Sequence, residues 1–160
     1  MSGAQKGFTL IEMMVTLALL ATLAAAALPT VEKYSQRKKE QELQLALRQI
    51  RTAIDRYYQV AQEGRLGSEK AIDDSGYPKE LSVLEKGVVD VTSPHGAKIY
   101  FLRRIPRDPM CDCEGRSNEE TWRIRSSKSE PGNFDRGKDV YDVASGSTQT
   151  GLNGVPYAQW

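Results

Sequence analysis

Cysteine and histidine are the side chains that most often do chemistry, and both are scarce in this sequence. The 160 residues contain two cysteines and one histidine, fewer than the three or four ligands of a typical zinc site. His95 stands between Pro94 and Gly96, which is typical of a turn. No arrangement of serine, histidine and aspartate typical of nucleophilic catalysis is evident. We therefore predict that the chain is not an enzyme.

The two cysteines form the motif Cys111-Asp112-Cys113. A redox enzyme would more typically show a C-x-x-C pair near a strand–helix–strand unit, which this sequence lacks. A bridge between residues i and i+2 would be strained relative to ordinary disulfide geometry. Free thiols, an intermolecular bond and capture of a soft metal are the alternatives, although unpaired thiols are a liability in an oxidising compartment.

Glu12 is the one charged residue in a long apolar run. The run extends from Phe8 to Leu28 and contains 21 residues. As a helix it would be about 30 Å long, which is the thickness of the hydrocarbon core of a bilayer. Residues 8–28 are therefore predicted to form a transmembrane helix.

Three kinds of segment could account for this run. A cleaved secretory signal would use small residues such as those at 24–27, but its apolar region is shorter and carries no carboxylate. A plain anchor would place Glu12 near a helix N-terminus, where the helix dipole favours an acid. A helix that leaves the bilayer to pack against copies of itself would pair the carboxylate with a cation of a neighbour.

The residues around the start of the run resemble a known processing site. Residues 1–7 are MSGAQKG, and the sequence from Gly7 to Glu12, GFTLIE, resembles the processing site of type IV pilins and type II secretion pseudopilins. The resemblance implies that a prepilin peptidase cleaves between Gly7 and Phe8, and that Phe8 becomes the N-methylated first residue. Glu12 is then the fifth mature residue, and its carboxylate pairs with the Phe8 amine of an adjacent subunit and sets the stagger.

Orientation in the membrane follows from the resemblance rather than from charge. Lys6 precedes the run, and four basic residues follow it: Lys33, Arg37, Lys38 and Lys39. By the positive-inside rule alone, this distribution would place the N-terminus outside the cytoplasm. The peptidase implied by the resemblance faces the cytoplasm, and nearby glutamates balance the far flank. We therefore expect a single-pass inner-membrane protein with a cytoplasmic N-terminus and a periplasmic head.

A long helix and a small sheet are expected after the run. Residues 31–63 contain neither glycine nor proline, and Gly64 is a natural stop. Apolar residues recur there at helical spacing: Leu43, Leu47, Ile50, Ile54, Tyr57 or Tyr58, and Ala61. Pro78 followed by Leu81 and Leu84 predicts a short helix. Short strands are predicted at 98–102, 122–125 and 140–143.

These elements define the expected fold class and domains. We predict an α+β, pilin-like fold in which a long N-terminal helix, transmembrane in its first half, packs on a small antiparallel sheet. Residues 1–7 are the leader, 8–63 the helix with its transmembrane part at 8–28, and 64–160 the periplasmic globular head. The modest core of the head requires the C-terminal half of the helix.

The resemblance extends along nearly the whole chain. The head is similar to the major pseudopilin of type II secretion, the G-type subunit, at Tyr77-Pro78, at residues 104–109, at Trp122 and at residues 152–154. Residues 110–121 depart from the usual pattern.

Calcium is the one cofactor that the resemblance implies. G-type pseudopilins commonly hold this ion in a C-terminal loop, and the corresponding residues here are 133–142. Asp135, Asp139 and Asp142 would supply the hard oxygen ligands that Ca²⁺ prefers. The alternative is a charged turn with aspartate caps, because Arg136 and Lys138 are interleaved and the spacing is not that of an EF-hand.

The predicted function is structural. The chain is expected to be a pseudopilin subunit that polymerises into a periplasmic pseudopilus driving protein export by type II secretion. Its partners would be copies of itself, other pseudopilins, the prepilin peptidase and the inner-membrane secretion platform. A formal net charge of +1 argues against nucleic acid. The alternatives are a type IV pilin of a surface filament and a membrane-anchored periplasmic binding module.

Overall fold

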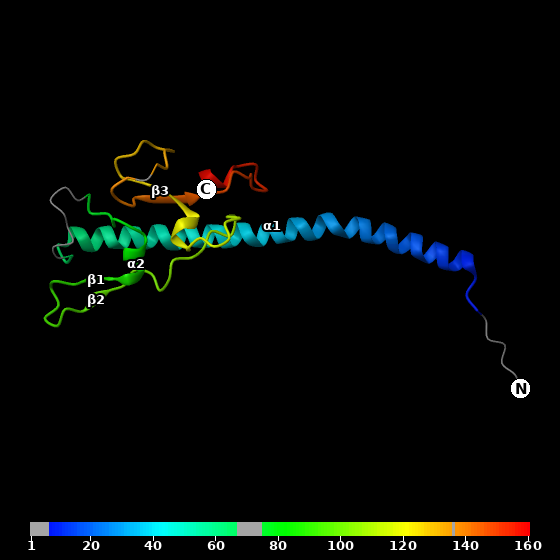
Figure 1. Cartoon of the computed structure of the whole chain (residues 1–160), viewed down its shortest axis with the longest axis horizontal. Helices are drawn as coiled ribbons and strands as arrows, with labels where there is room; N and C mark the ends of the chain where they lie inside the picture. Colours follow the sequence, from blue (N-terminus) through cyan, green and yellow to red (C-terminus); the bar gives the residue numbers. More distant parts are fainter. Residues whose placement is uncertain (1–6, 67–74, 136) are drawn as a thin grey trace, which may run out of the picture. The chain divides into compact units, whose positions relative to one another are not determined.

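The computed structural model describes residues 7–66, 75–135 and 137–160, with the side chains of 26–30 left aside (Figure 1). Most of the predicted leader, residues 1–6, therefore lies outside the described residues. The chain divides into two compact units, residues 1–38 and 39–160. The second unit combines the predicted head, residues 64–160, with the C-terminal part of the long helix, and from here on the term head denotes all of residues 39–160.

The long predicted helix is present as α1 (Leu10–Gln62). Thr9 caps its N-terminus: the Thr9 hydroxyl accepts a hydrogen bond from the Glu12 amide at 3.3 Å, and the Thr9 carbonyl accepts one from the Met13 amide at 3.2 Å. These bonds satisfy amides that have no partner within the helix. The helix ends just before Gly64, whose φ of +71° suits the residue after a helix C-terminus.

In the N-terminal unit, α1 carries large apolar side chains that face solvent. Exposed fractions are 77% for Leu10, 63% for Met14, 62% for Leu17 and 62% for Leu20. Within the described part of the chain, no helix is both long and apolar enough to be assigned as a membrane span. The transmembrane assignment of residues 8–28 stays a prediction.

In the head, the apolar stripe of α1 forms the centre of the core, as predicted. Its buried members are Leu43, Leu47, Ile50, Ile54, Tyr57 and Ala61. Residues from the rest of the head pack against this stripe, including Leu81, Leu84, Trp122, Ile124 and Val143. The head therefore depends on the C-terminal half of α1 for its core.

Two short antiparallel ladders stand in place of the single predicted sheet. One pairs β1 (Val88–Val89) with β2 (Lys98–Ile99), and the other pairs β3 (Trp122–Arg125) with β4 (Asp142–Ser145). In Figure 1 the β1–β2 hairpin and β3 lie on opposite sides of α1. The prediction of small antiparallel pairing is confirmed, but β1 was not predicted. The remaining elements are α2 (Ser82–Lys86), η1 (Glu119–Thr121) and η2 (Tyr157–Gln159).

The end of β2 and the start of β4 differ from the prediction, because main-chain amides there donate to carbonyls outside the ladders. Phe101 and Leu102 both donate to the Leu84 carbonyl, at 3.1 and 2.9 Å, so β2 ends at Ile99 rather than at residue 102. The Val140 amide donates to the Pro78 carbonyl at 2.8 Å, outside the ladder. β4 accordingly begins at residue 142, two residues later than predicted.

Ion pairs join the end of α1 to the first hairpin. Arg65 follows the helix, and its guanidinium contacts Asp90 at 2.5 Å and Glu63 at 3.3 Å. The hydrogen bond from Arg65, with further bonds from Thr92, lowers the pKa of Asp90 to about 2. The Val91 amide also donates to the Arg65 carbonyl at 3.0 Å. These contacts hold the hairpin against the helix end.

Candidate processing and assembly site

The predicted cleavage point lies in open, non-helical chain. Gly7, Phe8 and Thr9 precede the first turn of α1 and belong to no helix or strand. A Cβ added at Gly7 would meet no atom within 4 Å, and Phe8 is 77% exposed. The peptide bond between Gly7 and Phe8 is therefore accessible to a protease without any unfolding of the helix.

Glu12 occupies the third position of the helix with an unpaired side chain. Its main-chain amide is bonded to Thr9, but among the described residues the Glu12 carboxylate makes no hydrogen bond or ion pair. Apolar side chains surround it along the sequence, and Leu10 and Ile11 are 77% and 70% exposed. If packing against other helices buried this carboxylate, it would require a cationic partner.

The surface around Glu12 is too apolar for a subunit alone in water. Large exposed apolar residues continue from Phe8 to Leu23, far beyond the scattered apolar side chains of a soluble monomer. Small residues such as Ala18 and Ala21 lie among them and would allow close approach of another helix. This unit has the properties of a helix that is completed by lipid or by copies of itself.

The exposed Gly7–Phe8 bond, the capped helix start and the exposed Glu12 are the features expected of a processed subunit with an assembly helix. Comparisons agree with this class. Residues 3–28 match the family model of the prokaryotic N-terminal methylation motif. No solved structure matches the chain.

Curated relatives include pilins and a secretion protein. The type IV major pilin protein PilE of Neisseria gonorrhoeae is 35% identical over 99 residues, 58% of each chain. The type IV major fimbrial protein FimA of Dichelobacter nodosus is 38% identical over 65 residues, 41% of this chain and 42% of FimA. The type II secretion system core protein G of Klebsiella michiganensis is 26% identical over 110 residues, 66% of this chain and 68% of that protein. The chain thus spans just over half the length of the gonococcal pilin.

The N-terminal motif and these relatives support a place in the type IV pilin-like superfamily, which includes the pseudopilins. The relatives are pilin and secretion-system subunits rather than enzymes. These relatives support the prediction that the chain is not an enzyme. The motif match covers the predicted processing residues Gly7 and Phe8 as well as Glu12, while their individual roles stay predictions.

The three aspartates of the predicted calcium site have different surroundings. Asp135 is exposed, and its main-chain amide donates a hydrogen bond to the Asn133 side-chain oxygen. Asp142 accepts from Arg51 Nε at 2.9 Å and from Arg125 Nη2 at 3.3 Å. Among the described residues, no three histidine, cysteine, aspartate or glutamate side chains lie close enough to hold a metal ion.

Asp139 is buried and ringed by serines. It is 6% exposed, and it accepts hydrogen bonds from the Ser127 amide at 2.9 Å, from the Ser127 hydroxyl at 2.6 Å, and from the hydroxyls of Ser75 and Ser126. Burial alone would raise the pKa of Asp139, but the bonds from Ser126, Ser127 and Ser75 outweigh it and lower the pKa below its ordinary value. Its charge is stabilised by this chain's own donors.

These contacts do not fit a calcium ion shared by the three side chains. A cation at Asp142 would face the guanidinium groups of Arg51 and Arg125, and one at Asp139 would have to displace serine donors. Calcium binding therefore stays a proposal that rests on the family resemblance.

Replacing Asp139 by alanine is expected to lower the free energy of unfolding by about 2 to 4 kcal/mol, because several donors lose a charged acceptor at once. The matched control is Asp135→Ala in the same loop, which should change the free energy of unfolding by less than about 0.5 kcal/mol. The measurement is thermal unfolding of the full chain in detergent with a calcium chelator present.

Repeating these melts in calcium tests the metal proposal. Binding of the ion would raise the melting temperature with calcium concentration, and both alanine variants would lose that rise. If the unsubstituted chain has the same melting temperature in calcium and in chelator, the metal-site proposal is wrong and the charged turn with serine donors is the correct interpretation.

Several contacts that build the head were not predicted. Arg51 on α1 donates to Asp142, to the Val143 carbonyl at 3.0 Å and to the main-chain oxygen of Trp160 at 2.8 Å. Glu40 accepts from the Tyr157 hydroxyl at 2.9 Å. More than 90 residues separate the partners in each case, so local sequence carries no signal of these bonds.

Asp108 was likewise missed, although it is only 1% exposed. Its carboxylate accepts from the Ser145 hydroxyl at 2.7 Å, from the Met110 amide at 2.8 Å and from the Gly146 amide at 3.2 Å. Its own amide donates to Thr121 at 3.1 Å. Asp108 therefore ties the segment before β3 to the end of β4.

The structure pairs Cys111 with Cys113 in a disulfide, with a Cα–Cα distance of 5.3 Å. The sequence left the state of these cysteines open between a strained bridge, free thiols, an intermolecular bond and capture of a soft metal, and the structure has the bridge. The Cys111 amide donates to the Asp108 carbonyl at 3.2 Å, and Arg107 donates to the Cys113 carbonyl and, at 2.8 Å, to the Arg116 carbonyl. These bonds bring the two cysteines together.

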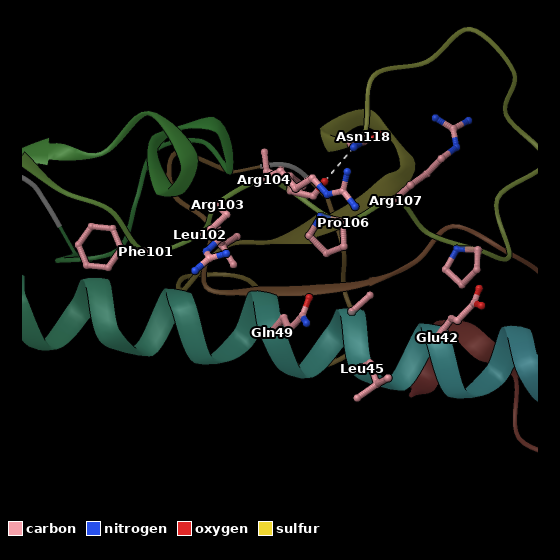
Figure 2. A pocket seen from close by; sticks show the side chains of 13 residues that line it. Glu42, Leu45, Gln49, Phe101, Leu102, Arg103, Arg104, Pro106, Arg107 and Asn118 are labelled. Atoms are coloured by element: carbon pink, nitrogen blue, oxygen red, sulfur yellow. Dashed lines mark hydrogen bonds between the residues drawn. The ribbon is translucent and has the colours of Figure 1, made fainter.

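A groove of about 780 Å³ lies between α1 and residues 101–109. Figure 2 shows Glu42, Leu45 and Gln49 on the helix side of the groove, and Asn118 opposite them donating a 2.8 Å bond to the Ile105 carbonyl. Arg103 and Arg104 line it and are exposed. The groove gives the head a basic surface beside the helix.

Proposed function

We propose that this chain is a pseudopilin that polymerises into a periplasmic pseudopilus for protein export by type II secretion. The observation that carries the proposal is the helix start, where an open Gly7–Phe8 bond leads into an exposed apolar helix with an unpaired Glu12. In a polymer of parallel helices, the freed amine of Phe8 on one subunit would lie near Glu12 of the next. Each subunit would then supply the partner that its neighbour lacks.

The same helix would hold the precursor in the inner membrane before assembly. We place residues 1–7 in the cytoplasm, where the prepilin peptidase would remove them, and the head in the periplasm. On assembly, the exposed apolar surface of the helix would leave the lipid and pack against the helices of other pseudopilins. The inner-membrane secretion platform would be the site of this assembly.

A surface type IV pilin is the second candidate. Favouring the pseudopilin, the match to the secretion protein extends over 66% of this chain and so includes part of the head. Favouring the pilin, the pilin relatives have higher identity, 35% for PilE and 38% for FimA, over shorter stretches. The two candidates share the assembly helix and differ in what the filament does.

Loss of the chain from its native cells is expected to stop export by type II secretion while leaving surface filaments at their normal level. The reason is that a pseudopilus subunit serves export, whereas a pilin subunit builds the surface filament. Exported protein in the medium and filaments sheared from the cells are measured together, with the unsubstituted chain returned as the control. Normal export combined with loss of sheared filaments would contradict the pseudopilin proposal and favour the pilin.

A further inference from the structure

A basic pocket on the head has a cation that nothing in the described chain neutralises. The pocket has a volume of about 710 Å³, which is within the range of ligand-binding clefts. We call it the Arg123 pocket and define it by Arg51, Arg123, Arg125, Phe134, Asp142 and Trp160. Of the three guanidinium groups there, Arg51 and Arg125 bind the Asp142 carboxylate and Arg51 also binds the main-chain oxygen of Trp160, whereas Arg123 has no acidic partner among the described residues.

The three arginines differ in their engagement. Arg51 and Arg125 share the two oxygens of Asp142, and Arg125 also lies 4.7 Å from the centre of the Tyr141 ring. Arg123 is exposed, and its guanidinium carbon lies 5.3 Å from the centre of the Phe134 ring. Within residues 7–66, 75–135 and 137–160, the Arg123 guanidinium forms no ion pair. Arg123 and Arg125 share the outer face of β3, because alternate residues of a strand point the same way. The guanidinium group of Arg123 therefore lies over the Phe134 ring with its N–H donors available to a ligand.

The chemistry of this pocket suits a carboxylate on a peptide. A guanidinium group recognises a carboxylate through two parallel hydrogen bonds. Phe134 and Trp160 supply apolar walls, and arginine with aromatic side chains is the composition enriched at protein–protein contacts. The occupant must therefore be an acidic segment of a protein.

The head itself displays a segment of this kind. Asp112 and Glu114 flank Cys113 and are exposed, and among the described residues neither carboxylate has a partner. We call residues 111–114 the disulfide loop. It is closed by the Cys111–Cys113 bond and braced by Arg107, so little conformational freedom remains to be lost on binding.

We propose that the Arg123 pocket of one subunit binds the disulfide loop of a second copy, with Arg123 paired to Asp112 or Glu114. The contact joins two different surfaces of the same head. Such a heterologous contact leaves one free pocket and one free loop at the ends of any chain of subunits, and so it extends into a ring or a helical filament. The inference rests on the proposed polymerisation and adds a contact between heads to the contact between helices.

Charge exchange in the full-length chain tests this contact. Arg123→Glu alone, and Asp112→Lys with Glu114→Lys alone, should each lower the yield of sheared filaments at least about tenfold, because like charges then meet at the contact. Combining all three substitutions in one chain restores opposite charges and should return most of the yield. The matched control is Lys128→Glu, an exposed change of the same charge outside the pocket, which should leave the yield unchanged.

The outcomes separate this inference from the proposed function. Membrane abundance and protease resistance of each variant confirm that it folds. Filaments from the unsubstituted chain together with a normal yield from Arg123→Glu would overturn the contact and leave polymerisation standing. A loss from Arg123→Glu that the added lysines do not restore would show that another acidic protein occupies the pocket, and would also overturn it. No filaments from the unsubstituted chain would refute the proposed function itself.

Discussion

Replacing Gly7 by valine is expected to leave the chain with its full leader, whereas the unsubstituted chain should begin at Phe8 with a methylated amine. A Cβ at residue 7 meets no atom of the described residues within 4 Å, so valine is not expected to disturb the helix start. The Thr9 cap that begins α1 also remains. The effect of the substitution must therefore arise in the peptidase, which would have to accept a branched side chain beside the bond it cuts.

Mass spectrometry of the intact protein measures this outcome directly. The matched control is Gly3→Val, which makes the same change four residues upstream of the bond and should leave cleavage normal. An unsubstituted chain that still starts at Met1 or Ser2 would contradict the pilin-type processing. Cleavage among the alanines at 24–27 would indicate a secretory signal instead.

Features that are local in sequence were predicted well. The long helix, its end near Gly64 and its buried stripe follow from spacing alone, because a helix brings residues three and four apart onto one face. The stripe residues Leu43, Leu47 and Ile50 are all 3% exposed or less. The motif from Gly7 to Glu12 is equally local, and the match to the methylation model covers it.

Features that depend on distant partners were not predictable. A strand continues only while its amides bond to the neighbouring strand. The amides of Phe101 and Leu102 bond instead to the Leu84 carbonyl, so β2 stops at Ile99, and strand propensity does not predict this. The surroundings of Asp139 and Asp142 were missed for the same reason. Their partners Ser75 and Arg51 come from other parts of the chain. Asp139 and Asp142 therefore have separate hydrogen-bond partners, although their spacing in the sequence suggests a shared metal site.

Replacing Glu12 by leucine is expected to remove filaments while insertion and processing continue. In lipid the change removes a charged group that costs a few kcal/mol in a membrane segment, so a plain anchor would insert as well or better. The Thr9 cap bonds the main-chain amide of residue 12 rather than its side chain, and the helix start survives. Processing should also survive, because the Gly7–Phe8 bond is unchanged.

In the polymer the same change leaves the Phe8 amine of a neighbour without its partner. Removing one member of a buried ion pair typically costs about 3 to 5 kcal/mol, which lowers each association constant by about two orders of magnitude or more. Because every subunit contact loses the same energy, we expect filament yield to fall below detection. Glu32→Leu serves as the matched control, since it removes a glutamate from the same helix beyond the apolar run.

Sheared filaments and membrane abundance are measured side by side for the unsubstituted chain and both variants. Full membrane abundance of Glu12→Leu with no filaments, beside normal filaments from Glu32→Leu, is the expected pattern. It would distinguish a helix that assembles from one that only anchors, because insertion of an anchor does not require a carboxylate at this position. A normal filament yield from Glu12→Leu would instead show that Glu12 does not set the stagger of the subunits and would return residues 8–28 to the role of a plain anchor.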